Sequence, residues 1–182
     1  YWLATLIVPG IIEKRNNPVK QLPPYSVSEE ASELYASLDF VADLHCDALL
    51  WGRDLTKRGK RGHVDFPRMQ EGNIALQVFT VVSKSPKGQN MESNSADTQD
   101  NITLLNIVQG RPISNWFSLM KRTLYQSAQL EEFAAEFHDE FIIVKNPEDV
   151  LELVEKRKAD KHVIGGLLGI EGAHALEGKM ET

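Results

Sequence analysis

One stretch of the sequence reads Val163-Ile-Gly-Gly-Leu-Leu-Gly-Ile-Glu171 and is apolar until its last residue. A short continuous apolar run of this kind is typical of a β-strand that is buried on both faces of a parallel sheet. A second compact apolar run, Phe40-Val-Ala-Asp-Leu-His-Cys-Asp47, also ends in polar residues. We therefore predict two buried strands whose last residues carry side chains that could bind a ligand.

Further segments between and beside these runs alternate between strand and helix patterns. Residues 74–82 and 141–144 are rich in β-branched and aromatic residues and are predicted strands. The predicted helices cover residues 26–38, 65–72, 101–109, 113–138 and 146–159. In the fourth of these, the spacing predicts a buried face made of Trp116, Phe117, Leu119, Met120 and Leu124. The polar stretch 83–100 is a predicted long exposed loop, and such loops are often functional.

This alternation predicts βα units that build a parallel sheet. In a (β/α)8 TIM barrel, the active site lies at the carboxyl ends of the strands, and a complete barrel needs about 250 residues. Four predicted strands in 182 residues amount to about half of such a barrel. We therefore expect an α/β fold, the N-terminal half of a (β/α)8 TIM barrel, and a chain that is a piece of a longer protein.

The candidate chemistry lies where two predicted strands end. Successive strand side chains alternate between faces, so His45 and Asp47 point the same way while Cys46 points to the other face. An imidazole and a carboxylate side by side can bind a divalent metal ion, and zinc is the natural candidate. Glu171 ends another predicted strand and could bring a carboxylate that bridges two metal ions.

The His-x-Asp pattern is weak by itself, because the chain contains a second copy at His63 and Asp65. That copy lies in a Gly- and Arg-rich turn, where Asp65 is better explained as the cap of a short helix. His174 follows a turn shortly after Glu171, and we expect it to support the ligands rather than to bind metal itself.

The composition excludes several classes of protein. The chain is 42% hydrophobic, which is enough for a sizeable core, and carries 26 acidic against 20 basic residues for a formal net charge of -6. This excess of acidic residues argues against a nucleic-acid-binding protein. The single cysteine, Cys46, excludes an internal disulfide.

The sequence predicts three parts. Residues 1–12 are apolar and could be the end of a membrane anchor, or a buried strand or helix. Residues 13–37 form a proline-containing linker and a short helix, for which Ser26 to Glu29 is a capping-box pattern. Residues 38–182 form the half-barrel. Anchoring through the first part would place the protein on a membrane, with an extracytoplasmic, bacterial periplasmic location as the corresponding expectation.

Three motifs in this order resemble the membrane dipeptidase (renal dipeptidase) family, peptidase family M19. They are Asp43-Leu-His-Cys-Asp47, His63-Val-Asp-Phe-Pro-Arg-Met-Gln-Glu-Gly72 leading into Ala75-Leu-Gln-Val-Phe79, and Gly169-Ile-Glu-Gly-Ala-His174. The resemblance covers roughly residues 38–182 and implies a (β/α)8 barrel that holds two zinc ions and hydrolyses dipeptides by a hydroxide bridging the metals.

The resemblance also implies roles for individual residues. His45 and Asp47 match ligands of one zinc ion, Glu171 matches the catalytic carboxylate that bridges both ions, and His174 matches a family histidine that is not a ligand. The two histidine ligands of the second zinc and the substrate-contacting residues are expected beyond Thr182. Many members have a tyrosine near the site where this chain has Val82. A homodimer is compatible with the resemblance.

Two alternatives stay open at this point. Another binuclear hydrolase barrel of the amidohydrolase type is disfavoured, because such enzymes usually show His-x-His on the first strand and this chain has Asp47 in the second position. A non-catalytic half-barrel that binds a partner is favoured by the 182 residues taken alone, since three ligands cannot complete two zinc sites. We therefore expect the chain by itself to be inactive.

Overall fold

The computed structural model describes residues 2–93, 95 and 97–179. The strands are β1 (Val41–Cys46), β2 (Ile74–Val82), β3 (Phe141–Val144) and β4 (Ile164–Glu171). The helices are α1 (Trp2–Asn16), α2 (Glu29–Ser37), α3 (Phe66–Glu71), α4 (Asn101–Val108), α5 (Ser114–Phe117), α6 (Leu119–Glu136) and α7 (Pro147–Ala159). Two short 3-10 helices, η1 (Ala48–Trp51) and η2 (Ala173–Leu176), follow β1 and β4. All four predicted strands are confirmed.

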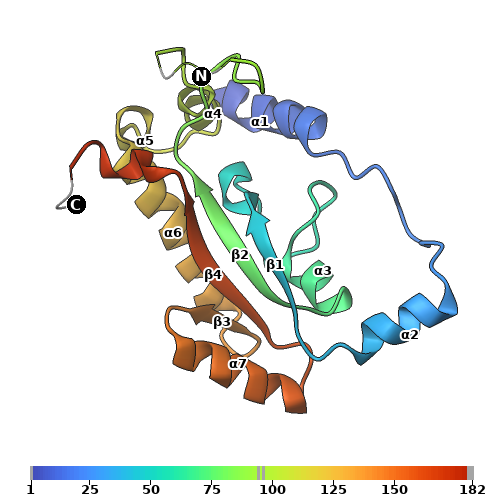
Figure 1. The fold of residues 1–182 in the computed structure, drawn as a ribbon. Coiled ribbons are helices and arrows are strands. Elements are labelled where there is room, and N and C mark those ends of the chain that lie inside the picture. The colour runs from blue at the N-terminus through green and yellow to red at the C-terminus, as the bar shows by residue number, and fades with distance from the viewer. Residues whose placement is uncertain (1, 94, 96, 180–182) are drawn as a thin grey trace.

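The four strands form one parallel sheet in the order β1-β2-β4-β3 (Figure 1). β2 and β4 pair along almost their whole length, from Leu76 opposite Gly165 to Val82 opposite Glu171. β3 pairs only with the first half of β4. The carboxyl ends of β1, β2 and β4 therefore meet at one edge of the sheet, and β3 does not reach it.

The strand order departs from the predicted run of four consecutive barrel strands. β1, β2 and β4 lie in chain order, which is compatible with part of an α/β barrel, but β3 lies outside β4 instead of between β2 and β4. Where β3 packs against β4, Phe141 lies over Gly166, and a Cβ atom at this position would lie 2.3 Å from its ring. The described residues thus establish a mixed α/β fold with a parallel sheet and do not establish a closed barrel.

Helices cover both faces of the sheet. On one face, Phe66 of α3 stacks on Phe141 at 4.3 Å between ring centroids, and Leu130 of α6 joins the same buried cluster. On the other face, Leu153 of α7 packs with Leu76 of β2. Two of the predicted helix starts are confirmed: Asp65 caps α3, and Asn146 forms a capping box with Asp149 at the start of α7.

β1 is less buried than predicted. It lies at the edge of the sheet, and Leu44 in its middle is 71% exposed. In β4, Ile170 near the carboxyl end is 54% exposed. The predicted burial of the first strand on both faces is therefore wrong, since Ala42, Leu44 and His45 are all exposed.

The predicted helix over residues 113–138 is two helices, α5 and α6. The chain becomes extended at Ser118, whose hydroxyl caps α6 by accepting a hydrogen bond from the Lys121 amide. The predicted apolar face is also wrong, since Phe117 is 82% and Leu124 52% exposed. The residues of α6 that are buried are instead Arg122, Thr123, Gln126 and Leu130.

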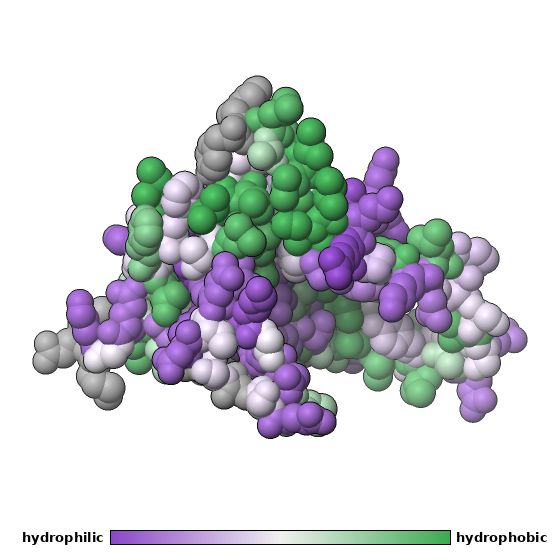
Figure 2. Space-filling model, turned by 90° about the horizontal axis from the view of Figure 1, so that it is seen from above, coloured by the Kyte–Doolittle hydropathy of each residue, from purple (hydrophilic) through white to green (hydrophobic). Residues whose placement is uncertain are grey.

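The N-terminal residues form helix α1, which continues to Asn16 and so includes the start of the predicted linker. The cap of α2 is Ser28 rather than Ser26. Figure 2 shows a hydrophobic patch in the region of α1, to which the exposed side chains of Leu3, Leu6, Ile7 and Ile11 contribute. Within the described residues, we found no helix with the length and apolar character needed to cross a bilayer.

Candidate metal centre

The structure brings His45, Asp47 and Glu171 together. His45 lies near the end of β1, Asp47 directly follows that strand, and Glu171 is the last residue of β4. The Nε2 atom of His45 is 3.4 Å from Oδ1 of Asp47 and 3.9 Å from Oε2 of Glu171. One donor atom from each side chain lies within 4.8 Å of the other two. β2 separates the two strands that carry them, so the sheet order itself produces this cluster.

The donor set fits a zinc ion. Zinc accepts imidazole nitrogen and carboxylate oxygen at about 2.0–2.2 Å, and tetrahedral geometry then places two ligand atoms about 3.3 Å apart. The distances of 3.4 and 3.9 Å from the His45 nitrogen are close to this spacing. All three side chains are partly exposed, so an ion could reach them from solvent.

Two hydrogen bonds orient His45 and Asp47 at the carboxyl end of β1. The hydroxyl of Thr80, on the neighbouring strand β2, donates to Oδ1 of Asp47. The carboxylate of Asp43 accepts from the backbone N–H of His45 at 3.1 Å. Our sequence analysis missed Thr80, although a lone hydroxyl within the apolar run Phe79-Thr-Val-Val82 was a signal that could have identified it.

The cluster borders a cavity of about 700 Å³, whose wall includes Asp47, Glu171 and His174. His174 lies on η2 and is not among the three clustered donors. Gly172 makes the turn between Glu171 and η2 at a φ of +77°, where a Cβ atom would lie 2.9 Å from Nδ1 of His174. A glycine is therefore required to bring His174 back beside the strand end.

The remaining sequence candidates lie elsewhere. Cys46 packs against the buried cluster on the opposite side of β1, and burial raises the pKa of its thiol to about 11. Asp65 is 1% exposed and accepts a hydrogen bond from the Arg68 amide, as a helix cap does, and a second from the Gly59 amide. His63 is exposed and is not part of the cluster. The second His-x-Asp pair thus has the structural role that its sequence context indicated.

Comparison with known proteins adds independent information on the family. The model of the family described as membrane dipeptidase (peptidase family M19) matches residues 28–182. No curated protein and no solved structure in the comparisons matches the chain. The match spans the strands that carry His45, Asp47 and Glu171, and it covers most of the chain. The chain therefore belongs to the membrane dipeptidase family, peptidase family M19.

Proposed function

We propose that this chain forms part of the active site of a zinc-dependent dipeptidase, which hydrolyses the peptide bond of dipeptides. Membership of the family supports a dipeptidase-type hydrolase. The observation that carries the finer proposal is the cluster of His45, Asp47 and Glu171, whose donor atoms lie within 4.8 Å of one another beside a cavity.

In this proposal His45 and Asp47 would hold zinc, and Glu171 would offer its carboxylate to this ion and to a second. A carboxylate has two oxygens and can contact both ions, whereas an imidazole contacts one. Two further histidines would complete the second zinc site, and we expect them on strands that complete a (β/α)8 barrel in the rest of the protein. The carboxyl ends of β1, β2 and β4 supply the part of the site that this chain contains.

Hydrolysis consumes one water molecule, breaks the amide C–N bond and leaves a carboxylate and an ammonium group. Two bound zinc ions would lower the pKa of water toward 7 and polarise the substrate carbonyl. The chain's own residues hold and orient these groups. Asp47 and Glu171 offset the positive charge of the metals, Thr80 fixes the rotation of the Asp47 carboxylate, and His174 lines the cavity beside them.

The N-terminal helix α1 is the proposed element for membrane attachment. Its side chains Leu3, Leu6, Ile7 and Ile11 are all more than half exposed, and Lys14 and Arg15 lie in its last turn. An apolar helix face next to basic residues is favourable at a membrane surface with anionic lipids.

The proposal is tested on the complete reading frame that contains this chain. We expect two zinc ions per protein by elemental analysis and hydrolysis of unmodified dipeptides. The Glu171→Gln variant should lose most of its zinc and most of its dipeptidase activity, because the amide carries no charge and bridges metals poorly. A Glu171→Gln variant with normal zinc content would contradict the assignment. A parent protein that binds no zinc and cleaves no dipeptide would favour the non-catalytic alternative.

A further inference from the structure

One wall of the cavity beside the candidate metal centre is a loop. Hydrogen bonds join the two ends of this loop, which together we call its base. Lys84, Ser85, Pro86 and Gln89, which lie between β2 and α4, face the cavity together with Glu171 and His174. The loop leaves and returns at neighbouring positions. The Asn101 amide donates to the Ser85 carbonyl at 2.9 Å, and the Lys87 amide donates to the Gln99 carbonyl at 2.7 Å.

Asp100 closes this base with its carboxylate. Oδ1 accepts from the backbone amides of Ser85, at 2.9 Å, and Ile102, at 3.0 Å. Oδ2 accepts from the hydroxyl of Thr103 at 2.9 Å and from the guanidinium of Arg122 at 2.5 Å. One side chain therefore joins the start of the loop, its end and the first turn of α4.

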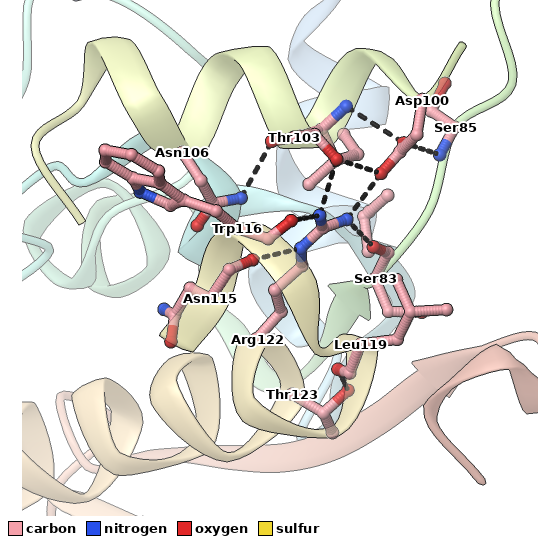
Figure 3. Close-up of polar contacts among 12 residues, drawn as sticks. Ser83, Ser85, Asp100, Thr103, Asn106, Asn115, Trp116, Leu119, Arg122 and Thr123 are labelled. Carbon is pink, nitrogen blue, oxygen red and sulfur yellow. Dashed lines mark hydrogen bonds and ion pairs between the residues drawn. The ribbon is translucent and has the colours of Figure 1, made fainter. Parts of the chain in front are cut away.

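Arg122 of α6 binds the other side of this base and is 2% exposed (Figure 3). Each of its five N–H groups has an acceptor. The acceptors are the carbonyls of Ser83, Asn115 and Trp116, the carboxylate of Asp100 and the hydroxyl of Thr103. They belong to the end of β2, the loop, α4 and α5, so one guanidinium fixes four segments.

The opposite wall of the cavity is fixed to the same helix. The carboxylate of Glu177, just after η2, accepts from the Ser118 hydroxyl at 2.6 Å and from the Met120 amide at 3.1 Å. η2 carries His174, so both walls of the cavity are tied to the first turn of α6. An apolar residue at position 122 would fill the buried space at lower desolvation cost, but it could not bind these carbonyls.

We propose that Arg122 is a positioning residue for substrate binding. Through Asp100 and Ser83 it holds the wall formed by Lys84, Ser85, Pro86 and Gln89 where it contacts the dipeptide bound at the metal centre. The inference rests on the proposed function, and Arg122 itself does not touch substrate. A loop released from this base would occupy its binding position for part of the time only, so the KM would rise while the chemistry at the metal centre would stay the same.

The test compares Arg122→Lys with a matched control in the complete reading frame. Lysine keeps the charge beside Asp100 but cannot serve five acceptors. The control is Arg157→Lys, since Arg157 is equally buried and bonds the carbonyls of Lys161 and Val163 at the opposite end of the sheet. A loop in place for a tenth of the time predicts a KM about tenfold higher for Arg122→Lys, with kcat and zinc content near those of the parent. Arg157→Lys should lower the melting temperature and leave the KM unchanged.

A second measurement does not depend on activity. Lys87 is exposed in the loop, so trypsin cleavage after it reports how often the loop leaves its place. We expect faster cleavage in Arg122→Lys than in Arg157→Lys. Equal cleavage rates would overturn the proposal, and so would faster cleavage with an unchanged KM.

If Arg122→Lys does not fold, Thr103→Val takes its place. It removes one of the five acceptors and should raise the KM and the cleavage rate by less. A parent without dipeptidase activity would refute the proposed function, while the cleavage comparison would still decide whether Arg122 holds the loop.

Discussion

The hydroxyl of Thr80 on β2 donates a hydrogen bond to the carboxylate of Asp47, the residue that directly follows β1. This contact joins neighbouring strands at the candidate metal centre. It uses one lone pair of Oδ1 of Asp47, the oxygen 3.4 Å from the His45 nitrogen, and leaves the other lone pair of Oδ1 and those of Oδ2 available. Groups that bind a metal ligand in this way fix its orientation, and their loss typically weakens metal binding.

We predict that Thr80→Val lowers zinc affinity by about 10- to 100-fold, because it removes the hydroxyl while keeping the shape of the side chain. Thr80→Ser should restore most of the affinity. The matched control is Thr56→Val. It removes a buried hydroxyl that lies away from the metal centre and donates to Asp54 at 2.6 Å. Competition titration against a zinc chelator measures all three variants. Equal affinities for Thr80→Val and Thr56→Val would contradict a role for Thr80 at the metal.

The two histidines that begin His-x-Asp pairs should differ sharply on substitution. His45→Ala removes a donor from the cluster with Asp47 and Glu171, and we expect the protein to lose at least half of its zinc. His63→Ala changes an exposed side chain outside that cluster and should keep the full zinc content. Elemental analysis of the two purified variants decides the matter. A larger zinc loss in His63→Ala than in His45→Ala would contradict the assignment and point to His63 and Asp65 as the metal ligands.

The sequence predicted those parts of the fold that depend on local signals. Asn146 followed by Pro147 marks the start of α7, because a capping side chain and a proline act within one turn. The candidate ligands could be predicted from local signals too, because His45, Asp47 and Glu171 are polar residues at the ends of apolar runs. The clustering of these three followed from the rule that parallel strands meet at their carboxyl ends.

The parts that sequence analysis did not predict depend on contacts between distant segments. The position of β3 outside β4 is a choice between pairing partners that are far apart in the chain, and no local pattern encodes it. The break at Ser118 depends on Arg122, which binds the carbonyls of Asn115 and Trp116 that a continuous helix would use itself. A helical pattern of hydrophobic residues contains no trace of a buried guanidinium that binds four segments.

The ion pair of Asp100 and Arg122 predicts a pH dependence of stability. Burial alone would raise the pKa of Asp100, but hydrogen bonds from the Ser85 amide, Arg122 and other donors outweigh it and lower the pKa below its ordinary value of 3.8. Because the folded pKa lies below the unfolded one, this contribution to stability is present above the unfolded pKa. It is lost as the pH falls through the folded pKa.

We therefore expect Asp100→Asn to destabilise the fold by about 3 kcal/mol near neutral pH, since it leaves the buried Arg122 charge without its partner. The difference in unfolding free energy between parent and variant should shrink as the pH is lowered from about 5 to about 2. Urea unfolding at several pH values measures it. A difference that stays constant over this range would show that Asp100 does not titrate differently in the folded and unfolded states.

Gly166 of β4 provides a test of how β3 packs against β4. A Cβ atom at Gly166 would lie 2.3 Å from Cζ of Phe141 and 3.1 Å from Cε2 of Phe79, both in the buried aromatic cluster. Gly166→Ala should therefore destabilise the protein by about 1–3 kcal/mol through overpacking. Gly10→Ala is the matched control, because the new methyl group would make an ordinary contact at 3.4 Å with Nη1 of Arg61. Gly10 lies in helix α1, where alanine is favoured over glycine. Thermal unfolding should show a lower midpoint for the first variant and an unchanged or higher midpoint for the second. The double variant Gly166→Ala with Phe141→Leu should recover part of the lost stability, because the smaller side chain relieves the contact. A double variant that recovers none would contradict the packing of Phe141 over Gly166.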